Sequence, residues 1–166
     1  MAVTTPESQV LKDKAAALIG NGVHGAQAAK VEVDTLTGRV RVLEMVGIQD
    51  CGLPINRLAV KSQLNGGMIQ ALSYALFEAR VIDPTLGLAL NANLEDYKLA
   101  GPQEIPKLTA IIDDDDTRSA VIGMAEPAIV PGHSAIANAV HNACGARVRD
   151  LPLTPDKVLA ALGRIG

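Results

Sequence analysis

The chain has 166 residues, of which 48% are hydrophobic but only 2% aromatic, and its formal net charge is −3. This length is enough for one ordinary domain with a sizeable core, which has to be built from aliphatic side chains and alanine. The acidic balance without a basic patch argues against nucleic acid or an anionic membrane as partner, and no apolar run approaches the roughly 20 residues of a membrane span.

The mean hydropathy of +0.21 is high for a soluble monomer. It predicts a chain that buries apolar surface against a partner, although an aliphatic core alone would also explain it. Cys51 and Cys144 are too few for a disulfide framework, and the first 18 residues lack the basic-then-apolar order of a signal peptide. We therefore expect a cytoplasmic location, or a periplasmic one if a partner exports the chain with it.

The first half of the chain begins with an expected N-terminal arm, residues 1–25, in which Lys12–Ile19 could form a short helix. Ala29–Asp34 alternates apolar and polar residues, as a half-buried strand does. Thr35–Gly38 supplies a turn with glycine where positive φ is needed, and Arg39–Asp50 alternates again before an apolar run. This order predicts a β-hairpin.

A long helix is predicted next, over Arg57–Ala79, with Asn56 as its N-cap. Apolar residues at roughly helical spacing define its expected buried face: Leu58, Leu64, Met68, Leu72, Ala75 and Leu76. Gly66 and Gly67 lie in the middle, where each costs roughly 1 kcal/mol relative to alanine. The pair indicates that something packs closely against the backbone, either another element of the fold or a ligand.

The next segments alternate loops with short apolar stretches. Val81–Gly87 is expected to form a short strand and a turn, Asn91–Leu99 an irregular stretch, and Lys107–Ile112 a strand. Asp113–Asp116 is a run of four acids. Adjacent carboxylates do not converge on one metal ion, so a solvated loop tip is the favoured interpretation.

Two helices are predicted at the end of the chain. The first, Gly132–Cys144, should end at Gly145, and its expected buried face consists of Ile136, Ala139, Val140 and Ala143. The second should start at Thr154-Pro155 and run to about Leu162. The predicted fold class is α+β: a β-hairpin, a long helix, further short strands and two C-terminal helices.

Glu126 is the most informative single residue, because it is the only acid in an otherwise apolar loop, Ser119–Pro131. Desolvation there would raise the pKa of its carboxyl group, which suits a general base at neutral pH. The alternative is an ordinary surface or salt-bridged glutamate. The three histidines show no zinc-ligand spacing, and no base is spaced to activate Cys51 as a nucleophile.

Several segments, taken in order, resemble the last part of the molybdopterin-binding subunit of molybdenum hydroxylases of the xanthine dehydrogenase and aldehyde oxidase type. The resemblance covers roughly residues 25–165. It is carried by Asp50-Cys51-Gly52 after the hairpin, Asn56, Gln63, Gly66-Gly67, Gln70, Asn93–Leu99, Gly123–Pro127 and the stretch from Ile136 to the C-terminal helix. The order and spacing of these segments together are specific.

The resemblance implies an oxidoreductase that hydroxylates an aldehyde or an N-heterocycle. It assigns Glu126 as the catalytic base toward a hydroxyl group on molybdenum. It places Gln63, Gly66 and Gly67 near the pterin, and the loop residues at the metal end of molybdopterin. Those loop residues are Val121, Ile122, Gly123, Met124 and Ala125. Residues 26–166 would then be the C-terminal molybdopterin-binding domain, with FAD and iron–sulfur clusters on partner subunits.

Length and two substitutions set this chain apart from the family pattern. Subunits of that family are several times longer, so we expect a split subunit that binds cofactor only with its N-terminal part on a separate chain. Ala125 stands where the family usually has glycine, and Ile122 where a polar residue is common. These departures favour an alternative, a non-catalytic structural or cofactor-binding remnant. A third hypothesis is an unrelated small-molecule binding domain.

Overall fold

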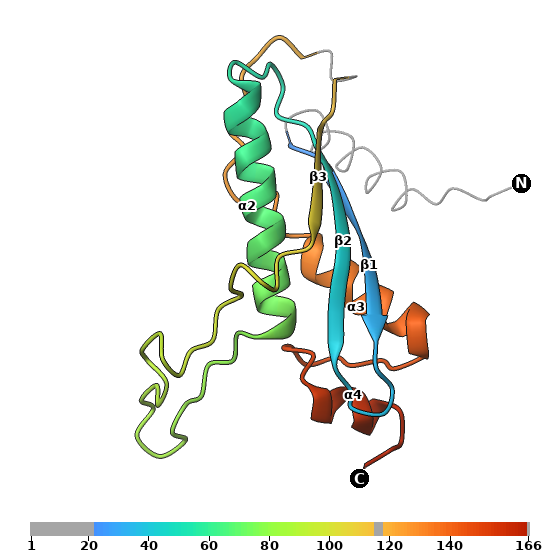
Figure 1. The fold of residues 1–166 in the computed structure, drawn as a ribbon. Coiled ribbons are helices and arrows are strands. Elements are labelled where there is room, and N and C mark those ends of the chain that lie inside the picture. The colour runs from blue at the N-terminus through green and yellow to red at the C-terminus, as the bar shows by residue number, and fades with distance from the viewer. Residues whose placement is uncertain (1–21, 115–117, 166) are drawn as a thin grey trace, which may run out of the picture.

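A computed structural model describes residues 22–114 and 118–165 of the chain (Figure 1). The six elements of this part are, in order, β1 (Gly25–Val33), β2 (Val40–Gln49), α2 (Arg57–Leu76), β3 (Lys107–Ile112), α3 (Gly132–Cys144) and α4 (Pro155–Ala161). The α+β prediction is confirmed. The helix expected over Lys12–Ile19, like most of the expected N-terminal arm, lies outside the described residues.

The three strands form one mixed sheet in the order β1-β2-β3. β1 and β2 are the predicted antiparallel hairpin, and the turn between them uses Gly38 at φ 75°. A side chain at Gly38 would also collide with the backbone of Pro155, at 2.2 Å from its carbonyl oxygen. β3 pairs with β2 in parallel, and α2 makes the crossover between them. The strand β3 was predicted, but its parallel pairing was not.

A β-bulge explains the apolar run that interrupts the alternation of β2. Lys30 pairs with Glu44 while Val31 pairs with Val42, so Leu43 is an extra residue in β2. The bulge shifts the side-chain alternation by one position. As a result Val42 and Met45 are both buried in the core.

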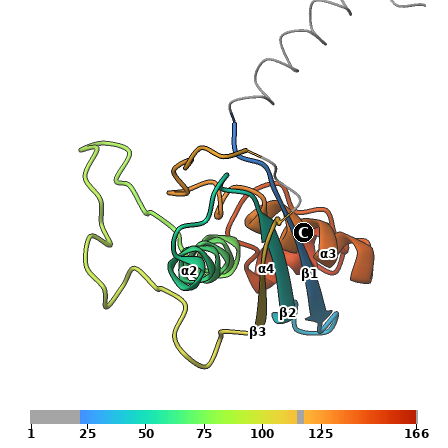
Figure 2. The ribbon, with the colours of Figure 1, turned by 90° about the horizontal axis from the view of Figure 1, so that it is seen from above.

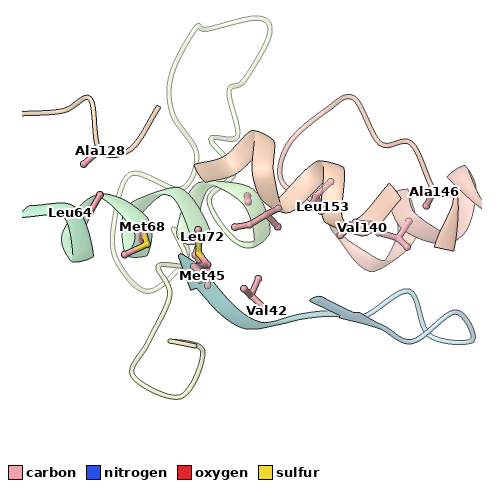
Figure 3. Packing of buried hydrophobic residues seen from close by; sticks show 12 residues of the cluster. Val42, Met45, Leu64, Met68, Leu72, Ala128, Val140, Ala146 and Leu153 are labelled. Carbon is pink, nitrogen blue, oxygen red and sulfur yellow. The ribbon is translucent and has the colours of Figure 1, made fainter. Parts of the chain in front are cut away.

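The hydrophobic core lies between one face of the sheet and the helices α2 and α3 (Figures 2 and 3). Aliphatic side chains from β2, α2, α3 and the C-terminal segment fill it. They include Val42, Met45, Leu64, Met68, Leu72, Ile136, Val140 and Val158. No aromatic ring belongs to this buried set, as the composition predicts, so small and medium-sized side chains fill the space between the elements.

Four details of the predicted helices were wrong. α2 ends at Leu76 and not at Ala79, because the Ser73 carbonyl accepts from the N–H groups of both Phe77 and Glu78. Leu58 is exposed, because it lies in the first turn of α2, outside the core. Ala139 is only half-buried and Ala143 is exposed, because the buried face of α3 is narrow. The cap at Asn56 is confirmed: its Oδ1 accepts from the Ala59 N–H at 3.0 Å.

The C-terminal elements follow the predictions. Gly145 ends α3 with φ 81°, in the left-handed region. Thr154 is the N-cap of α4, and Pro155 occupies its first turn. Among the residues that the structure describes, none of the helices has the length and apolar content needed to cross a membrane.

A segment between α2 and β3 projects away from the body of the molecule (Figures 1 and 2). We call residues 79–101 the tongue. The strand predicted within Val81–Gly87 is reduced to a single bridge, Ile82 with Ala89, whereas the predicted turn is present, with Gly87 at φ 68°. One bridge is too little pairing for a stable strand on its own.

Candidate functional site

An open groove of about 370 Å³ lies beside the first turns of α2. Its floor and walls come from the segment before α2, from α2 itself and from the loop before α3. The residues that line it include Cys51, Leu53, Asn56, Ala59, Gln63, Val121, Ile122, Gly123 and Met124. The structure therefore brings five of the nine predicted site residues to one groove; Ala125 and Glu126 follow directly along the chain.

The start of the Glu126 loop is fastened to the end of the hairpin. The Leu53 N–H donates to the Ala120 carbonyl at 3.0 Å, and the Ile122 N–H donates to the Cys51 carbonyl at 3.1 Å. Gly52 makes this possible: its φ is 64°, and a Cβ there would lie 2.2 Å from the Ala120 oxygen. The glycine of the Asp50-Cys51-Gly52 turn is thus required by the close approach of the loop.

A buried carboxylate strengthens the same junction. Asp50 Oδ2 lies 2.8 Å from Arg118 Nη2 and 2.8 Å from His24 Nδ1, and Asp50 Oδ1 accepts from the His24 N–H at 2.7 Å. Arg118 also donates to the Gly22 carbonyl at 2.6 Å. A buried acid needs such partners, because an uncompensated charge in the interior is costly. The cluster joins the start of β1, the end of β2 and the loop.

Gln63 holds the middle of the loop. Its Nε2 donates a hydrogen bond to the Ala125 carbonyl, directly before Glu126. The side chain therefore reaches from α2 across the groove to the residue next to the candidate base. Its carbonyl oxygen is left to accept a further hydrogen bond.

The two mid-helix glycines have different surroundings. A Cβ at Gly67 would lie 2.6–2.7 Å from the backbone and Cβ of Ala128, so α2 and the loop touch there without room for a side chain. Gln27 of β1 also donates to the Ala128 carbonyl. At Gly66, in contrast, nothing in the described chain lies within 4 Å of a Cβ. Close packing within the fold thus explains Gly67 but not Gly66, and neither glycine lines the groove.

Glu126 lies at the corner of the loop, between the Gln63 anchor at Ala125 and the buried Ala128. Its carbonyl accepts from the Ile129 N–H at 3.0 Å and so starts the turns that lead into α3. Its side chain is exposed. The prediction that the apolar loop itself would bury this carboxylate was wrong: of the loop's aliphatic residues Ala128 is buried, whereas Val121 and Val130 are themselves exposed and form no cover. Any desolvation of Glu126 has to come from a surface outside residues 22–114 and 118–165.

The loop also offers unused hydrogen-bond donors. Within the described chain, the N–H groups of Gly123, Met124 and Ala125 donate to no carbonyl or side chain. A Cβ at Gly123 would meet nothing within 4 Å. Three consecutive peptide donors beside an open glycine can approach a polar ligand closely.

The other candidates do not gather into a site. Asp114 forms a bidentate ion pair with Arg57, which lowers the pKa of Asp114 and raises that of Arg57. Asp115 and Asp116 lie outside the described residues. His141 Nδ1 is 3.1 Å from the Gly145 carbonyl at the end of α3. Over residues 22–114 and 118–165, no group of three histidine, cysteine or acidic side chains could hold a metal ion.

Sequence reasoning missed the residues that fix the loop. Asp50 was noted only as part of a turn, and Arg118, His24 and Gln27 were given no role in holding the loop. Their partners lie 26 to 101 residues away in the sequence, so local patterns carried no signal for these contacts. A charged residue at the very end of a predicted strand, as Asp50 is, would have been the one available hint.

Comparison with known proteins gives a consistent picture. A family model for the molybdopterin cofactor-binding domain matches residues 8–106. A xanthine dehydrogenase molybdenum-binding subunit of Escherichia coli O157:H7 is 34% identical over 81% of this chain and 18% of that subunit. An aldehyde oxidoreductase molybdenum-binding subunit of Escherichia coli is 37% identical over 80% of this chain and 19% of that subunit.

The fold agrees with these matches. The aldehyde oxidoreductase from Desulfovibrio desulfuricans superposes with a TM-score of 0.73 and 31% identity, over 84% of this chain and 15% of that structure. The chain thus spans about a fifth of the length of the curated relatives that it matches.

Proposed function

This chain belongs to the family of molybdopterin cofactor-binding domains of xanthine dehydrogenase and aldehyde oxidoreductase type, and we propose that it is the C-terminal part of the cofactor-binding subunit of a molybdenum hydroxylase. The reaction class is hydroxylation of an aldehyde or an N-heterocycle. Residues 26–166 form the cofactor-binding domain, and the catalytic residue is Glu126. The remaining part of the subunit completes the site.

One observation supports this proposal most strongly. Gln63 on α2 and the loop residues Val121–Met124 line the same groove, and a hydrogen bond from Gln63 to Ala125 connects them directly in front of Glu126. Residues that are more than 50 positions apart in the sequence thus meet next to the candidate base. An arrangement of this kind positions a polar ligand and a proton acceptor relative to each other.

The donor set fits the cofactor. The pterin carries fixed hydrogen-bond donors and acceptors, and molybdopterin supplies the redox centre of the reaction when it is bound. The N–H groups of Gly123, Met124 and Ala125 would hold acceptor atoms of the cofactor, and the Gln63 amide would pair with a polar edge. Gly66 leaves one face of α2 open, so that the cofactor could approach the backbone closely. Gly67 would serve the site indirectly, because it lets Ala128 of the loop pack against α2.

Glu126 would act as the general base. The loop places its carboxylate at an exposed corner, where it can take a proton from the group that attacks the substrate. The facing part of the subunit would cover this corner, exclude water and raise the proton affinity of the carboxylate by desolvation. Ala125 adds a methyl group next to the base, but its carbonyl still accepts from Gln63.

Two features favour the second candidate function, a non-catalytic remnant that binds cofactor or stabilises a complex. Ala125 replaces the glycine that usually precedes the glutamate in this family, and the described chain leaves Glu126 exposed. Cofactor binding in the assembled protein is compatible with both functions. They differ in whether turnover depends on Glu126.

The decisive substitution is Glu126→Gln in the assembled enzyme. The amide preserves size and hydrogen bonding but cannot accept the proton. Turnover should fall about 10²- to 10⁴-fold, the usual contribution of a general base, while the molybdenum content stays unchanged. Turnover that is equal in the variant and the parent enzyme would favour the remnant.

Cofactor binding should depend on the rest of the subunit. We expect the purified chain to contain no molybdenum, and the assembled complex to contain one molybdenum per chain. Iron–sulfur clusters and FAD are expected on partner subunits, which take the electrons onward. Stoichiometric molybdopterin on the isolated chain, measured by metal analysis and pterin fluorescence, would refute this dependence.

A further inference from the structure

The tongue, residues 79–101, has the largest concentration of exposed aliphatic side chains in the described chain. Seven of its valine, isoleucine and leucine residues are between 41% and 78% exposed: Val81, Ile82, Leu86, Leu88, Leu90, Leu94 and Leu99. Exposed apolar surface of this extent marks an interaction site more often than a free surface.

The tongue is nevertheless held in a defined shape. Its two limbs are joined by hydrogen bonds from Asp83 N–H to the Leu88 carbonyl and from Leu90 N–H to the Val81 carbonyl, at 2.9 and 2.8 Å. The side chain of Asn91 bridges the limbs as well, to Val81 N–H and to the Ala79 carbonyl. Polar contacts, and not burial of its aliphatic residues, therefore fix this segment.

The base of the tongue is tied to the end of α2. The Tyr97 hydroxyl donates to Glu78 at 2.8 Å, which raises the pKa of Tyr97, and the Ala100 N–H donates to the buried Ser73 Oγ at 3.0 Å. A segment that is shaped and anchored before it meets a partner loses less conformational entropy on docking. The aliphatic side chains of the tongue are thus held in an exposed position before any partner binds.

The chemistry of the tongue indicates an apolar partner surface. From Val81 to Leu94 the only charged side chain is Asp83, and its Oδ1 accepts from the N–H groups of Thr85 and Leu86 within the turn. An almost uncharged tip has no side chains that could form ion pairs with an acidic or basic surface. It is complementary to a cleft lined by aliphatic or aromatic residues.

The position of the tongue in the family match indicates what provides that cleft. The tongue lies within residues 8–106, the stretch that the family model matches, so its surface belongs to the part of the chain that relatives share. In the aldehyde oxidoreductase subunit of Escherichia coli the match covers 19%, which leaves about four-fifths of that subunit without a counterpart here. That remainder is protein surface which the relative carries beyond the matched stretch.

We infer that the tongue is the docking element through which this chain joins the remaining part of the molybdenum-binding subunit, with its aliphatic side chains inserted in an apolar cleft of that part. The inference rests on the proposed function. It adds the surface that holds the two parts together and so keeps the Glu126 corner covered.

The test transplants this chain into an intact relative. The segment of the Escherichia coli aldehyde oxidoreductase subunit that matches this chain is replaced by residues 22–165, and the hybrid is produced with its partner subunits. Assembly is measured as co-elution of the hybrid with its partner subunits and as the molybdenum content of the complex. The test variant is Leu86→Glu with Leu90→Glu. The controls are Leu86→Met with Leu90→Met, and Leu36→Glu at the exposed hairpin turn (82% exposed).

We expect the parent hybrid and both controls to assemble, and the double glutamate variant to lose assembly at least ten-fold, because two carboxylates would enter an apolar cleft. The isolated double variant should keep the parent's thermal unfolding midpoint, which shows that the loss is not one of folding. Equal assembly of all hybrids, or equal loss in the Leu36→Glu control, would overturn the docking role.

Two further outcomes separate the inference from the proposed function. A parent hybrid that folds and joins its partners but binds no molybdenum would contradict the proposed function and leave the docking role intact. A dimer of the isolated chain that Leu86→Glu with Leu90→Glu dissociates, seen by light scattering, would assign the tongue to a second copy and overturn the inference.

Discussion

Two long segments without regular structure, the Glu126 loop and the tongue, connect the main elements of this fold and are similarly rich in aliphatic residues. The loop, residues 119–131, is anchored to the hairpin, to Gln63 and to Gly67, and it buries Ala128. Within the described residues, the tongue is anchored to the rest of the fold at its base alone and exposes its aliphatic side chains. The difference shows that the chain itself positions its candidate base, but leaves its largest apolar segment for another surface.

The largest expected effect separates the core from the tongue. Met68→Ala removes a fully buried side chain and should lower the free energy of unfolding by about 2–5 kcal/mol. Leu88→Ala in the tongue should change it by no more than about 0.5 kcal/mol in the isolated chain. Chemical denaturation measures both. A destabilisation by Leu88→Ala as large as that by Met68→Ala would show that the tongue packs against the body.

Neighbouring glycines give the next test, because their helical contexts are matched. Gly67→Ala forces a methyl group into the Ala128 backbone, which costs about 1–3 kcal/mol and outweighs the roughly 1 kcal/mol gained in helix propensity. Gly66→Ala meets open space and should stabilise by up to about 1 kcal/mol. Stabilisation of similar size in both variants would refute the close contact between Gly67 and the Ala128 backbone.

The Gln63 anchor should affect the loop more than global stability. Gln63→Ala removes one partly solvated hydrogen bond, so the free energy of unfolding should fall by at most about 1 kcal/mol. Amide hydrogen exchange near Glu126 should nevertheless become faster. Gln70→Ala, on the same helix, is the control and should leave exchange in the loop unchanged. If amide exchange near Glu126 is equally fast in the two variants, Gln63 does not hold the loop.

The smallest effect concerns a pair on the outer face of the sheet. The Lys107 ammonium, 2.7 Å from Glu44, lowers the pKa of that carboxyl in the folded state. The pair therefore contributes stability above the unfolded pKa of about 4.5, and the contribution is lost as the pH falls through the lower folded pKa. The urea midpoint of Glu44→Gln should lie slightly below that of the parent at pH 7, and the gap should close in acid. A gap that widens in acid would contradict this sign.

Most regular elements could be predicted from the sequence because their signals are local. The alternation and Gly38 gave the hairpin, and Asn56, Gly145 and Pro155 marked helix ends. The parallel pairing of β3 and the bulge at Leu43 depend on contacts between distant segments, which no local pattern records. For the same reason, sequence alone could not tell that Gly67 meets Ala128.

For the candidate site, the resemblance predicted which residues to consider together but not how they are arranged. Resemblance grouped Gln63, the loop residues and Glu126, and the structure brings Gln63 to the loop. The predicted burial of Glu126 was wrong. Composition shows that its neighbours in the sequence are apolar, but not in which direction their side chains point. The tongue shows the same limit: its aliphatic residues could equally have formed core.

The most direct test of the account is the rate of a single turnover in the assembled enzyme, compared between Glu126→Gln and the parent at equal molybdenum content. If this chain supplies the proton acceptor, the rate at which substrate first reduces the molybdenum centre should fall by about two to four orders of magnitude. Substrate binding should change little. A first turnover at the parent's rate would contradict the assignment of Glu126 and with it the catalytic role of this chain.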